Sequence, residues 1–417
     1  MEKLIIHGGG TLSGHLVLSA SKNAFLPILA GSILTDKEVV LHRCPYYSDI
    51  FNMCEILEGI GVRIKREDSV LTIDPSNIKE GEVMSCLAKK LRSSIFMLGP
   101  LLGRLKKAKV AYPGGCEIGS RPIDLHIKGL EALNVKVTDK HGYLFCDGSN
   151  MKGGKVYLDF PSVGATENIM MAAVLTKGQT VIYNAAKEPE VEDLQNFLNS
   201  LGAKIYGAGS DIIKIEGVKE LHETSYFPIS DRIITGTYII ACAMVGGKIE
   251  IEGVNPFHIS SLIDKLDKTS CKVTTVGDKI KITSEGRHKN FKKIETMPYP
   301  GFPTDLQPQI MALAAVSAGT SIIVENLFDA RFKHVPELVK MGADIVVKDR
   351  TAIIHGKDLY GAEVSCADLR GGAALVLAGL SGSGYTTISN LQHIDRGYDR
   401  IEKDLAMLGA DIIRTFS

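Results

Sequence analysis

The chain has 417 residues, and its 48 basic side chains are balanced by 48 acidic ones. This balance excludes both the basic surface typical of nucleic-acid-binding proteins and an acidic tail. The length exceeds what one hydrophobic core usually supports, so two or three domains are expected. No apolar segment reaches the roughly 18 residues of a membrane span, and the N-terminus lacks a signal-peptide pattern.

The eight cysteines are scattered without a Cys-x-x-Cys pair, which predicts neither a structural zinc site nor a disulfide framework. Free thiols in a large chain are typical of the cytoplasm. Most of these cysteines are expected to be small hydrophobic core residues, and Cys242 in the apolar segment 238–244 is the clearest example.

Two patterns recur along the chain with a period of roughly 70 residues, which indicates an internal repeat. A short apolar sequence motif between a helix and a strand begins at Gly61, Asn134, Gly202, Ser270, Gly342 and Gly409. Apolar helices rich in small residues are expected at 24–34, 91–102, 166–175, 232–245, 306–318 and 371–380. Because these helices are apolar all round, they are predicted to be buried on every side.

Each buried helix is followed by a strand, an amphipathic helix and two short strands, as in segments 180–183, 190–201, 204–206 and 212–215. Three such units around a common helical centre would make one domain of about 200 residues, and six would make two. An open solenoid is the alternative, but it would leave the apolar helices half covered. The strand expected at 4–7 has no partner in the first unit, so it could complete the last one.

This arrangement requires two crossings between the domains, near Ala20 and near Ser230, and a ligand is expected in the cleft between them. Within the first domain, the loop 112–122 places Cys116 among three glycines, two prolines and Arg121. A thiol close to a guanidinium and to backbone N–H groups ionises readily, so Cys116 is a candidate acid or nucleophile. The alternative is a free cysteine in a glycine-rich turn.

Two helix starts are candidate anion sites. Lys22 follows Ser21 at the start of the first buried helix, where the helix dipole favours phosphate or carboxylate. The turn 161–166 could likewise cradle a phosphate. The alternatives are a solvated lysine after a serine cap and an ordinary N-terminal turn.

Acidic and basic residues recur at matching places in the repeats. Asp231, Asp305 and Asp368 each begin a buried helix, where aspartate is a favoured cap. Asp305 differs because the rigid segment 299–304 precedes it, which would aim a general base. The planar guanidinium group of arginine binds carboxylates and phosphates through two parallel hydrogen bonds. Five arginines at corresponding positions of the repeats therefore predict a site for a multiply anionic ligand. They are Arg92, Arg121, Arg331, Arg370 and Arg396.

The segment 393–398 is the densest polar cluster near the C-terminus. A histidine in such a segment, here His393, is more often a structural hydrogen-bonding residue than a catalyst. The sequence contains no phosphate-binding loop, no dinucleotide fingerprint and no metal-ligand spacing. It therefore predicts an arginine-rich site without a metal or cofactor, and no obligate protein partner.

These motifs resemble the enolpyruvyl transferase family, in particular the members that act on UDP-N-acetylglucosamine. The resemblance is carried by segments along nearly the whole chain: SKNA at Ser21, LRSSIFMLGPLLGR at Leu91, PGGCEIGSRPIDLHI at Pro113, PSVGATENIMMAA at Pro161, DRIITGT at Asp231, PYPGFPTDLQPQ at Pro298, RFKHVPEL at Arg331, DLRGGAALVLAGL at Asp368 and HIDRGYDRIE at His393.

The resemblance implies an α/β fold, a two-domain inside-out barrel of six βαβαββ repeats with helices at the centre of each domain. It implies one domain of residues 22–229 and a second of 1–21 and 230–417, with the active site in the interdomain cleft. The implied reaction transfers enolpyruvyl from phosphoenolpyruvate to the 3′-hydroxyl of UDP-N-acetylglucosamine with release of phosphate, which opens peptidoglycan synthesis.

The resemblance also implies the roles of individual residues. Cys116 matches the family's proton donor to C3 of phosphoenolpyruvate, which fosfomycin alkylates, and Asp305 matches the base toward the 3′-hydroxyl. Lys22, Arg121 and Arg396 match the cationic ring around the reacting anion, with Arg92 and Arg370 nearby. The further substrate contacts implied are Asn23, Pro122, Asp124, Leu125, Ser162, Val163, Gly164, Leu327 and Arg331.

Two alternatives to this function remain at the level of the sequence. The first is the related transferase that acts on shikimate 3-phosphate, which shares the fold and chemistry but lacks the cysteine loop. The second is a catalytically silent paralogue that binds UDP-sugars, which would be expected to have lost Cys116, Asp305 or Lys22. All three residues are present.

Overall fold

The computed structural model describes residues 2–78, 80–114, 119, 122–286 and 288–416. They form two compact units. We call the unit of residues 2–18 and 230–416 the Asp305 unit, and the unit of residues 19–114 and 122–229 the Lys22 unit. Among the helices of these described ranges, none is long and apolar enough to cross a membrane.

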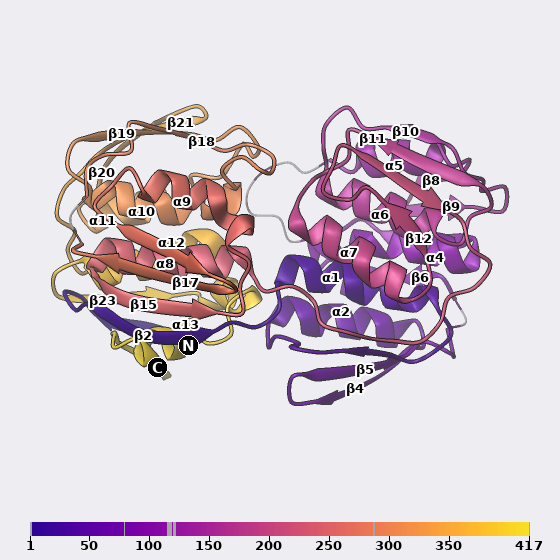
Figure 1. Ribbon diagram of the computed structural model, residues 1–417, viewed down its shortest axis with the longest axis horizontal. Helices are drawn as coiled ribbons and strands as arrows, with labels where there is room; N and C mark the ends of the chain where they lie inside the picture. The colour runs from indigo at the N-terminus through magenta and orange to yellow at the C-terminus, as the bar shows by residue number, and fades with distance from the viewer. Residues whose placement is uncertain (1, 79, 115–118, 120–121, 287, 417) are drawn as a thin grey trace. The chain divides into compact units, whose positions relative to one another are not determined.

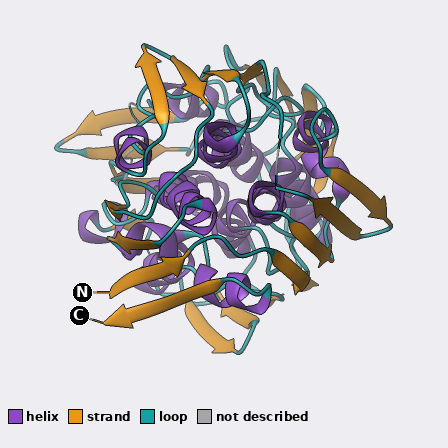
Figure 2. Cartoon of the chain, turned by 90° about the vertical axis from the view of Figure 1, so that its left-hand side faces the viewer, coloured by secondary structure: helices purple, strands orange, loops and turns teal. Residues whose placement is uncertain are grey.

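Three helices pack against one another at the centre of the Asp305 unit, and the strands lie around them (Figures 1 and 2). They are α8 (Arg232–Val245), α10 (Gln307–Val316) and α12 (Leu369–Ser381). Every residue of α8 from Ile233 to Met244 is buried, including Cys242. The predicted burial of these helices is therefore confirmed, because an apolar helix without a polar face is stable only when covered on all sides.

The Lys22 unit repeats this plan with α1 (Lys22–Gly31), α4 (Leu98–Leu105) and α6 (Val163–Ala173). The amphipathic helices α2 (Ser48–Gly59), α5 (Asp124–Glu131) and α7 (Pro189–Ser200) pack against them. Shorter helices lie elsewhere in the chain: α3 (Ser85–Ala88), α9 (Ser260–Leu266), α11 (Val335–Lys340), α13 (Ile401–Met407), η1 (Ser32–Leu34), η2 (Arg92–Met97), η3 (Pro256–Ile259), η4 (Thr304–Leu306) and η5 (Leu391–Arg396).

The described strands form six four-stranded sheets, three in each unit. The Asp305 unit holds β16-β17-β15-β2 (Lys272–Val276, Lys279–Ser284, Gly247–Glu252, Leu12–Val17), β18-β19-β21-β20 (Lys293–Glu295, Thr320–Val324, Thr351–His355, Asp344–Lys348) and β22-β23-β1-β24 (Glu363–Ser365, Tyr385–Ser389, Glu2–His7, Asp411–Phe416). The Lys22 unit holds β14-β3-β5-β4 (Thr224–Tyr226, Val39–Leu41, Val70–Asp74, Arg63–Glu67), β6-β7-β9-β8 (Glu82–Val83, Lys107–Ala111, Tyr143–Asp147, Lys136–Lys140) and β10-β11-β13-β12 (Lys155–Tyr157, Gln179–Tyr183, Ile212–Glu216, Lys204–Tyr206).

Each sheet contains one parallel pair. In four sheets the pair joins the strand before a buried helix to the strand after the same helix. In the other two sheets β2 pairs with β15 and β14 pairs with β3, so the leading strand comes from a distant part of the chain. The repeat is therefore βαβαββ, as the family resemblance implied. The pattern of residues alone missed the leading strand. Most leading strands have only two or three residues, such as Glu82–Val83 and Lys293–Glu295, too few to show an alternating pattern.

Strands from distant parts of the chain pair with one another in both units. The prediction for the N-terminal strand is confirmed, because β1 pairs antiparallel with both β23 and β24 of the last sheet. The two chain ends consequently lie side by side in Figure 2. In the Lys22 unit, β14 pairs in parallel with β3, so the end of that unit's segment returns to its beginning.

Candidate functional site

The centre of the candidate site in the Asp305 unit is a carboxylate held by two arginines. Asp305 lies in η4, and its side chain is 27% exposed. Arg331 donates from Nη2 to Oδ1 at 2.8 Å, and Arg370 donates from Nη2 to Oδ2 at 3.1 Å. Both arginine side chains are only 3% exposed. Because both carboxylate oxygens are engaged, the orientation of Asp305 is defined by two separate elements.

Arg370 is part of a wider polar network at the centre of the unit. Its guanidinium lies 5.7 Å from the centroid of the Tyr398 ring, and Nη1 is 3.5 Å from the Tyr398 hydroxyl. That hydroxyl lies 2.8 Å from Oγ1 of Thr237, which accepts from Gln309 at 3.1 Å. Burial alone would lower the pKa of Arg370, but Asp305, Tyr398 and Asp231 together outweigh burial and raise this pKa.

Two guanidiniums share one carboxylate in this cluster, which leaves one positive charge in excess. Arg331 also donates to the backbone oxygen of Thr304, from Nε at 3.3 Å and from Nη2 at 3.1 Å. Fixed cations at a partly open carboxylate can bind an anionic ligand, while the carboxylate accepts a hydrogen bond or a proton from a hydroxyl.

The other two aspartates at helix starts are caps. Asp231 accepts from the backbone N–H groups of Ile233 and Ile234 at 2.8 and 2.9 Å. Asp368 accepts from those of Arg370 and Gly371 at 3.0 and 2.9 Å. Asp305 makes no such cap, since Pro303 occupies the N-cap position of η4. The role of Asp305 as a general base stays a prediction.

In the Lys22 unit, Lys22 is the first residue of α1, and Ser21 caps the helix by accepting from the N–H of Ala24. Lys22 is not a solvated lysine, because its side chain is only 10% exposed. Its Nζ lies 3.1 Å from Oδ2 of Asp49, which is in the first turn of α2. Lys22 therefore lies at a helix N-terminus, and its ammonium group is paired with one buried carboxylate.

The predicted phosphate turn begins α6, where Ser162 accepts from the N–H of Ala165 at 3.4 Å. His126 lies beside it, since a Cβ added to Gly164 would come within 3.1 Å of the imidazole. Nδ1 of His126 is 2.8 Å from the buried amide of Asn168, whose oxygen accepts from the N–H of Gly99. This network lies at the start of α6, where residues 162–164 are partly exposed.

The remaining predicted residues are divided between the two units. In the Lys22 unit, Asn23, Arg92 and Leu125 are half-buried and Pro122 and Asp124 are exposed, while in the Asp305 unit Leu327 and Arg396 are half-buried. Arg331 and Arg370 are thus the pair of predicted arginines that the structure joins through one carboxylate. Cys116 and Arg121 lie outside the described residues, so their roles stay predictions.

Several residues that complete these clusters have no distinctive pattern in the sequence. Asp49 lies 27 residues after Lys22, and its only sequence signal is its place early in an amphipathic helix. Tyr398 lies in the polar segment singled out near the C-terminus, but its contact with Arg370 depends on the fold. Glu325 directly follows β19 and is fully buried beside the segment that carries Asp305.

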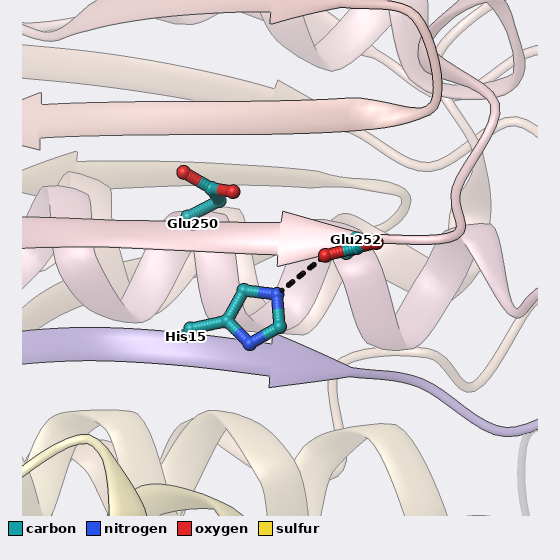
Figure 3. Close-up of side chains that lie close together, drawn as sticks. All are labelled: His15, Glu250 and Glu252. Atoms are coloured by element: carbon teal, nitrogen blue, oxygen red, sulfur yellow. Dashed lines mark hydrogen bonds and ion pairs between the residues drawn. The ribbon is translucent and has the colours of Figure 1, made fainter.

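Among the described residues, His15, Glu250 and Glu252 place their ligand atoms close enough together to suit a metal ion (Figure 3). His15 Nε2 is 3.0 Å from Glu252, and Lys279 is 2.9 Å from the same carboxylate. Lys281 lies 2.9 Å from Glu250. Because lysines already neutralise both carboxylates on this sheet surface, the cluster is a network of surface ion pairs.

The sequence matches known proteins along nearly its whole length. The family model described as EPSP synthase (3-phosphoshikimate 1-carboxyvinyltransferase) matches residues 6–405. A relative from Caldanaerobacter subterraneus subsp. tengcongensis, named UDP-N-acetylglucosamine 1-carboxyvinyltransferase 2, is 51% identical over 99% of this chain and 100% of its own. A relative of the same name from Clostridium tetani is 48% identical over the same shares of the two chains.

Solved structures support the same fold. The enolpyruvyl transferase NikO from Streptomyces tendae superposes with a TM-score of 0.89 at 24% identity, covering 100% of this chain and 99% of its own. An EPSP synthase from Acinetobacter baumannii gives a TM-score of 0.74 at 17% identity over both full chains. The predicted two-domain inside-out α/β architecture is therefore confirmed. With relatives of this identity over its full length, the chain belongs to the UDP-N-acetylglucosamine 1-carboxyvinyltransferase family of transferases.

Proposed function

We propose that the chain transfers the enolpyruvyl group of phosphoenolpyruvate to the 3′-hydroxyl of UDP-N-acetylglucosamine and releases phosphate. Membership in the family supports this reaction. The observation that carries it within the molecule is the cluster of Asp305, Arg331 and Arg370. This cluster combines a proton acceptor with an excess of positive charge, and the reaction needs both.

The reaction proceeds by addition and elimination. The 3′-oxygen bonds to C2 of phosphoenolpyruvate while C3 takes up a proton, and Asp305 accepts the proton that the hydroxyl loses. C3 then loses a proton, and the bond between C2 and the phosphate oxygen breaks. We assign the proton transfer at C3 to Cys116, in accordance with the family motif.

Cationic side chains of both units have a common task in this proposal. Phosphoenolpyruvate carries several negative charges, and cations that are fixed before the reaction stabilise charge without rearrangement. We assign Lys22, Arg121 and Arg396 to the phosphate and carboxylate of this substrate, and Ser162, Val163 and Gly164 to the UDP moiety. Because these residues belong to both units, the reaction requires both to contribute to one substrate complex.

We also infer that the enzyme acts in the cytoplasm, where thiols stay reduced. The cysteines of the described part of the chain are all free, which supports this assignment.

Phosphate release tests the proposal. We expect the purified protein to release phosphate from phosphoenolpyruvate when UDP-N-acetylglucosamine is added, and not when shikimate 3-phosphate is added. Release with shikimate 3-phosphate instead would assign the chain to the related reaction. Tight binding of the sugar nucleotide without any phosphate release would show that the chain is a silent binding protein.

A further inference from the structure

Glu325 is a fully buried carboxylate outside the set of expected site residues, and four groups donate hydrogen bonds to it. Its Oε1 accepts from the hydroxyl of Thr296 at 2.9 Å and from the N–H groups of Leu327 and Phe328 at 2.9 and 3.2 Å. Its Oε2 accepts from the hydroxyl of Thr304 at 2.9 Å. A carboxylate is costly to bury unless hydrogen bonds replace its hydration, and these bonds do so.

The two oxygens of Glu325 connect η4, which carries Asp305, to the loop that leads to Arg331. Oε2 holds Thr304, which directly precedes Asp305, whereas Oε1 holds the beginning of the loop that leads to Arg331. The register explains why one residue reaches both loops: β18 and β19 run parallel, and Glu295 lies opposite Val324. Glu325 and Thr296 therefore emerge side by side at the carboxyl ends of the two strands.

Arg331 closes the connection from the other side. It donates to the backbone oxygen of Thr304 and to Oδ1 of Asp305. Thr304 is consequently held twice, by Glu325 through its hydroxyl and by Arg331 through its carbonyl. Loss of the hydroxyl contact would leave the backbone before Asp305 fixed on one side only.

We propose that Glu325 is a positioning residue for enolpyruvyl transfer, which sets the place of the Asp305 carboxylate relative to Arg331 through Thr304. The proposal rests on the proposed function, because it assigns Asp305 to the acceptor hydroxyl. Glu325 does not touch the reacting atoms in this scheme. It confines the carboxylate to one geometry, on which the rate of a proton transfer depends steeply.

A matched pair of variants isolates the link to Asp305. Thr304→Val removes the hydroxyl at nearly constant volume, and we expect kcat to fall about ten- to a hundredfold. The KM values for both substrates should change by less than about threefold, since substrate contacts remain. Thr304→Ser restores the hydroxyl and should restore most of kcat. Thr176→Val is the control, because it removes another buried hydroxyl, bonded 2.7 Å from the oxygen of Ala172 in the Lys22 unit.

Glu325→Gln completes a double-mutant cycle. The amide oxygen can stay with the N–H groups of Leu327 and Phe328, so its NH2 group faces the Thr304 hydroxyl, which can accept from it. A neutral contact then replaces a charge-assisted one, and we expect a smaller loss of kcat than in Thr304→Val. The double variant should lose no more than the worse single variant, because both changes act on the same hydrogen bond. Wild-type kcat in Thr304→Val, equal losses in Thr304→Ser, or losses that multiply in the double variant would overturn the inference. Absence of turnover in the wild-type protein would overturn the proposed function and this inference with it.

Discussion

The Asp305 and Lys22 units have the same repeat but differ in the ratio of cationic to anionic side chains at their candidate sites. In the Asp305 unit two buried guanidiniums share one carboxylate. In the Lys22 unit one ammonium is paired with one carboxylate at 3.1 Å. Among the three side chains of the first cluster the positive charges outnumber the negative ones, although the charge of Asp231 also acts on Arg370, whereas the second pair has one charge of each sign.

This difference indicates a division of labour within one architecture. A carboxylate between two arginines has both oxygens fixed, which suits a group that must meet a hydroxyl in one orientation. A lysine is a point charge on a flexible stem, and it can turn toward an incoming anion. The same fold thus places a rigid acceptor in one unit and an adaptable cation in the other.

Removal of the Asp305 charge should produce the largest effect. Asp305→Asn takes away the proposed proton acceptor, and we expect kcat to fall by roughly 10²–10⁴. It also leaves two buried guanidiniums without their shared charge, which should destabilise this unit by about 3–5 kcal/mol. Phosphate release measures the first effect, and native-state hydrogen exchange of α12 measures the second.

Exchange in α1 is the internal control, because the Lys22 unit keeps its own charge pair. If Asp305→Asn lowered protection equally in both units, or retained wild-type kcat, the cluster would not be the rigid acceptor that the comparison assigns to it.

The contrast between the units also shows what sequence alone can predict. The buried helices were recognised because their positions are apolar on every side, and β1 was placed correctly because it lacked a partner nearby. Asp305 was separated from the capping residues Asp231 and Asp368 because a local feature, the rigid segment before it, distinguishes it.

Contacts between distant residues could not be predicted in the same way. Arg331 and Arg370 are predicted as anion-binding arginines, but the carboxylate that they share depends on the fold, which brings together η4, the turn before α11 and the start of α12. Neither local periodicity nor composition pairs Lys22 with Asp49. Glu325 went unnoticed because an acidic residue after a strand has no distinctive local pattern. The family resemblance supplied roles for residues but not the bonds that hold them.

A second asymmetry is a buried carboxyl in the Lys22 unit. Glu167 in α6 is fully buried, and neither side-chain oxygen has a hydrogen-bond partner among the described residues. Burial raises its pKa well above the ordinary value, and the charges of Glu190 and Glu188 raise it further. The folded state therefore keeps a proton that the unfolded state loses as the pH rises above about 4.5.

This carboxyl should make stability depend on pH. Its contribution is fully present below the unfolded-state pKa and is lost as the pH rises toward the folded-state pKa. Glu167→Gln removes the ionisable group, so its stability relative to wild type should increase as the pH rises from 5 to 8. Urea unfolding at several pH values measures this difference, and a difference independent of pH would contradict the assignment.

Asp49→Asn should have the smallest effect on activity and stability, and it tests the charge difference between the two units most directly. The variant retains an oxygen for Lys22 but removes the compensating charge, which should cost about 1–2 kcal/mol of stability. Lys22 then faces a neutral amide in place of this carboxylate, so the pair carries one more positive charge. We expect the KM for phosphoenolpyruvate to fall about threefold, because an added net charge attracts the anion more strongly.

Stability and substrate affinity should thus change in opposite directions in this variant, whereas both activity and stability fall in Asp305→Asn. Steady-state kinetics at two salt concentrations checks the cause, since the gain in affinity should shrink as ionic strength rises. An unchanged or higher KM at low salt would mean that Asp49 orients Lys22 more than it neutralises it. The two units would then both depend on a fixed geometry, and the proposed division between a rigid acceptor and an adaptable cation would be wrong.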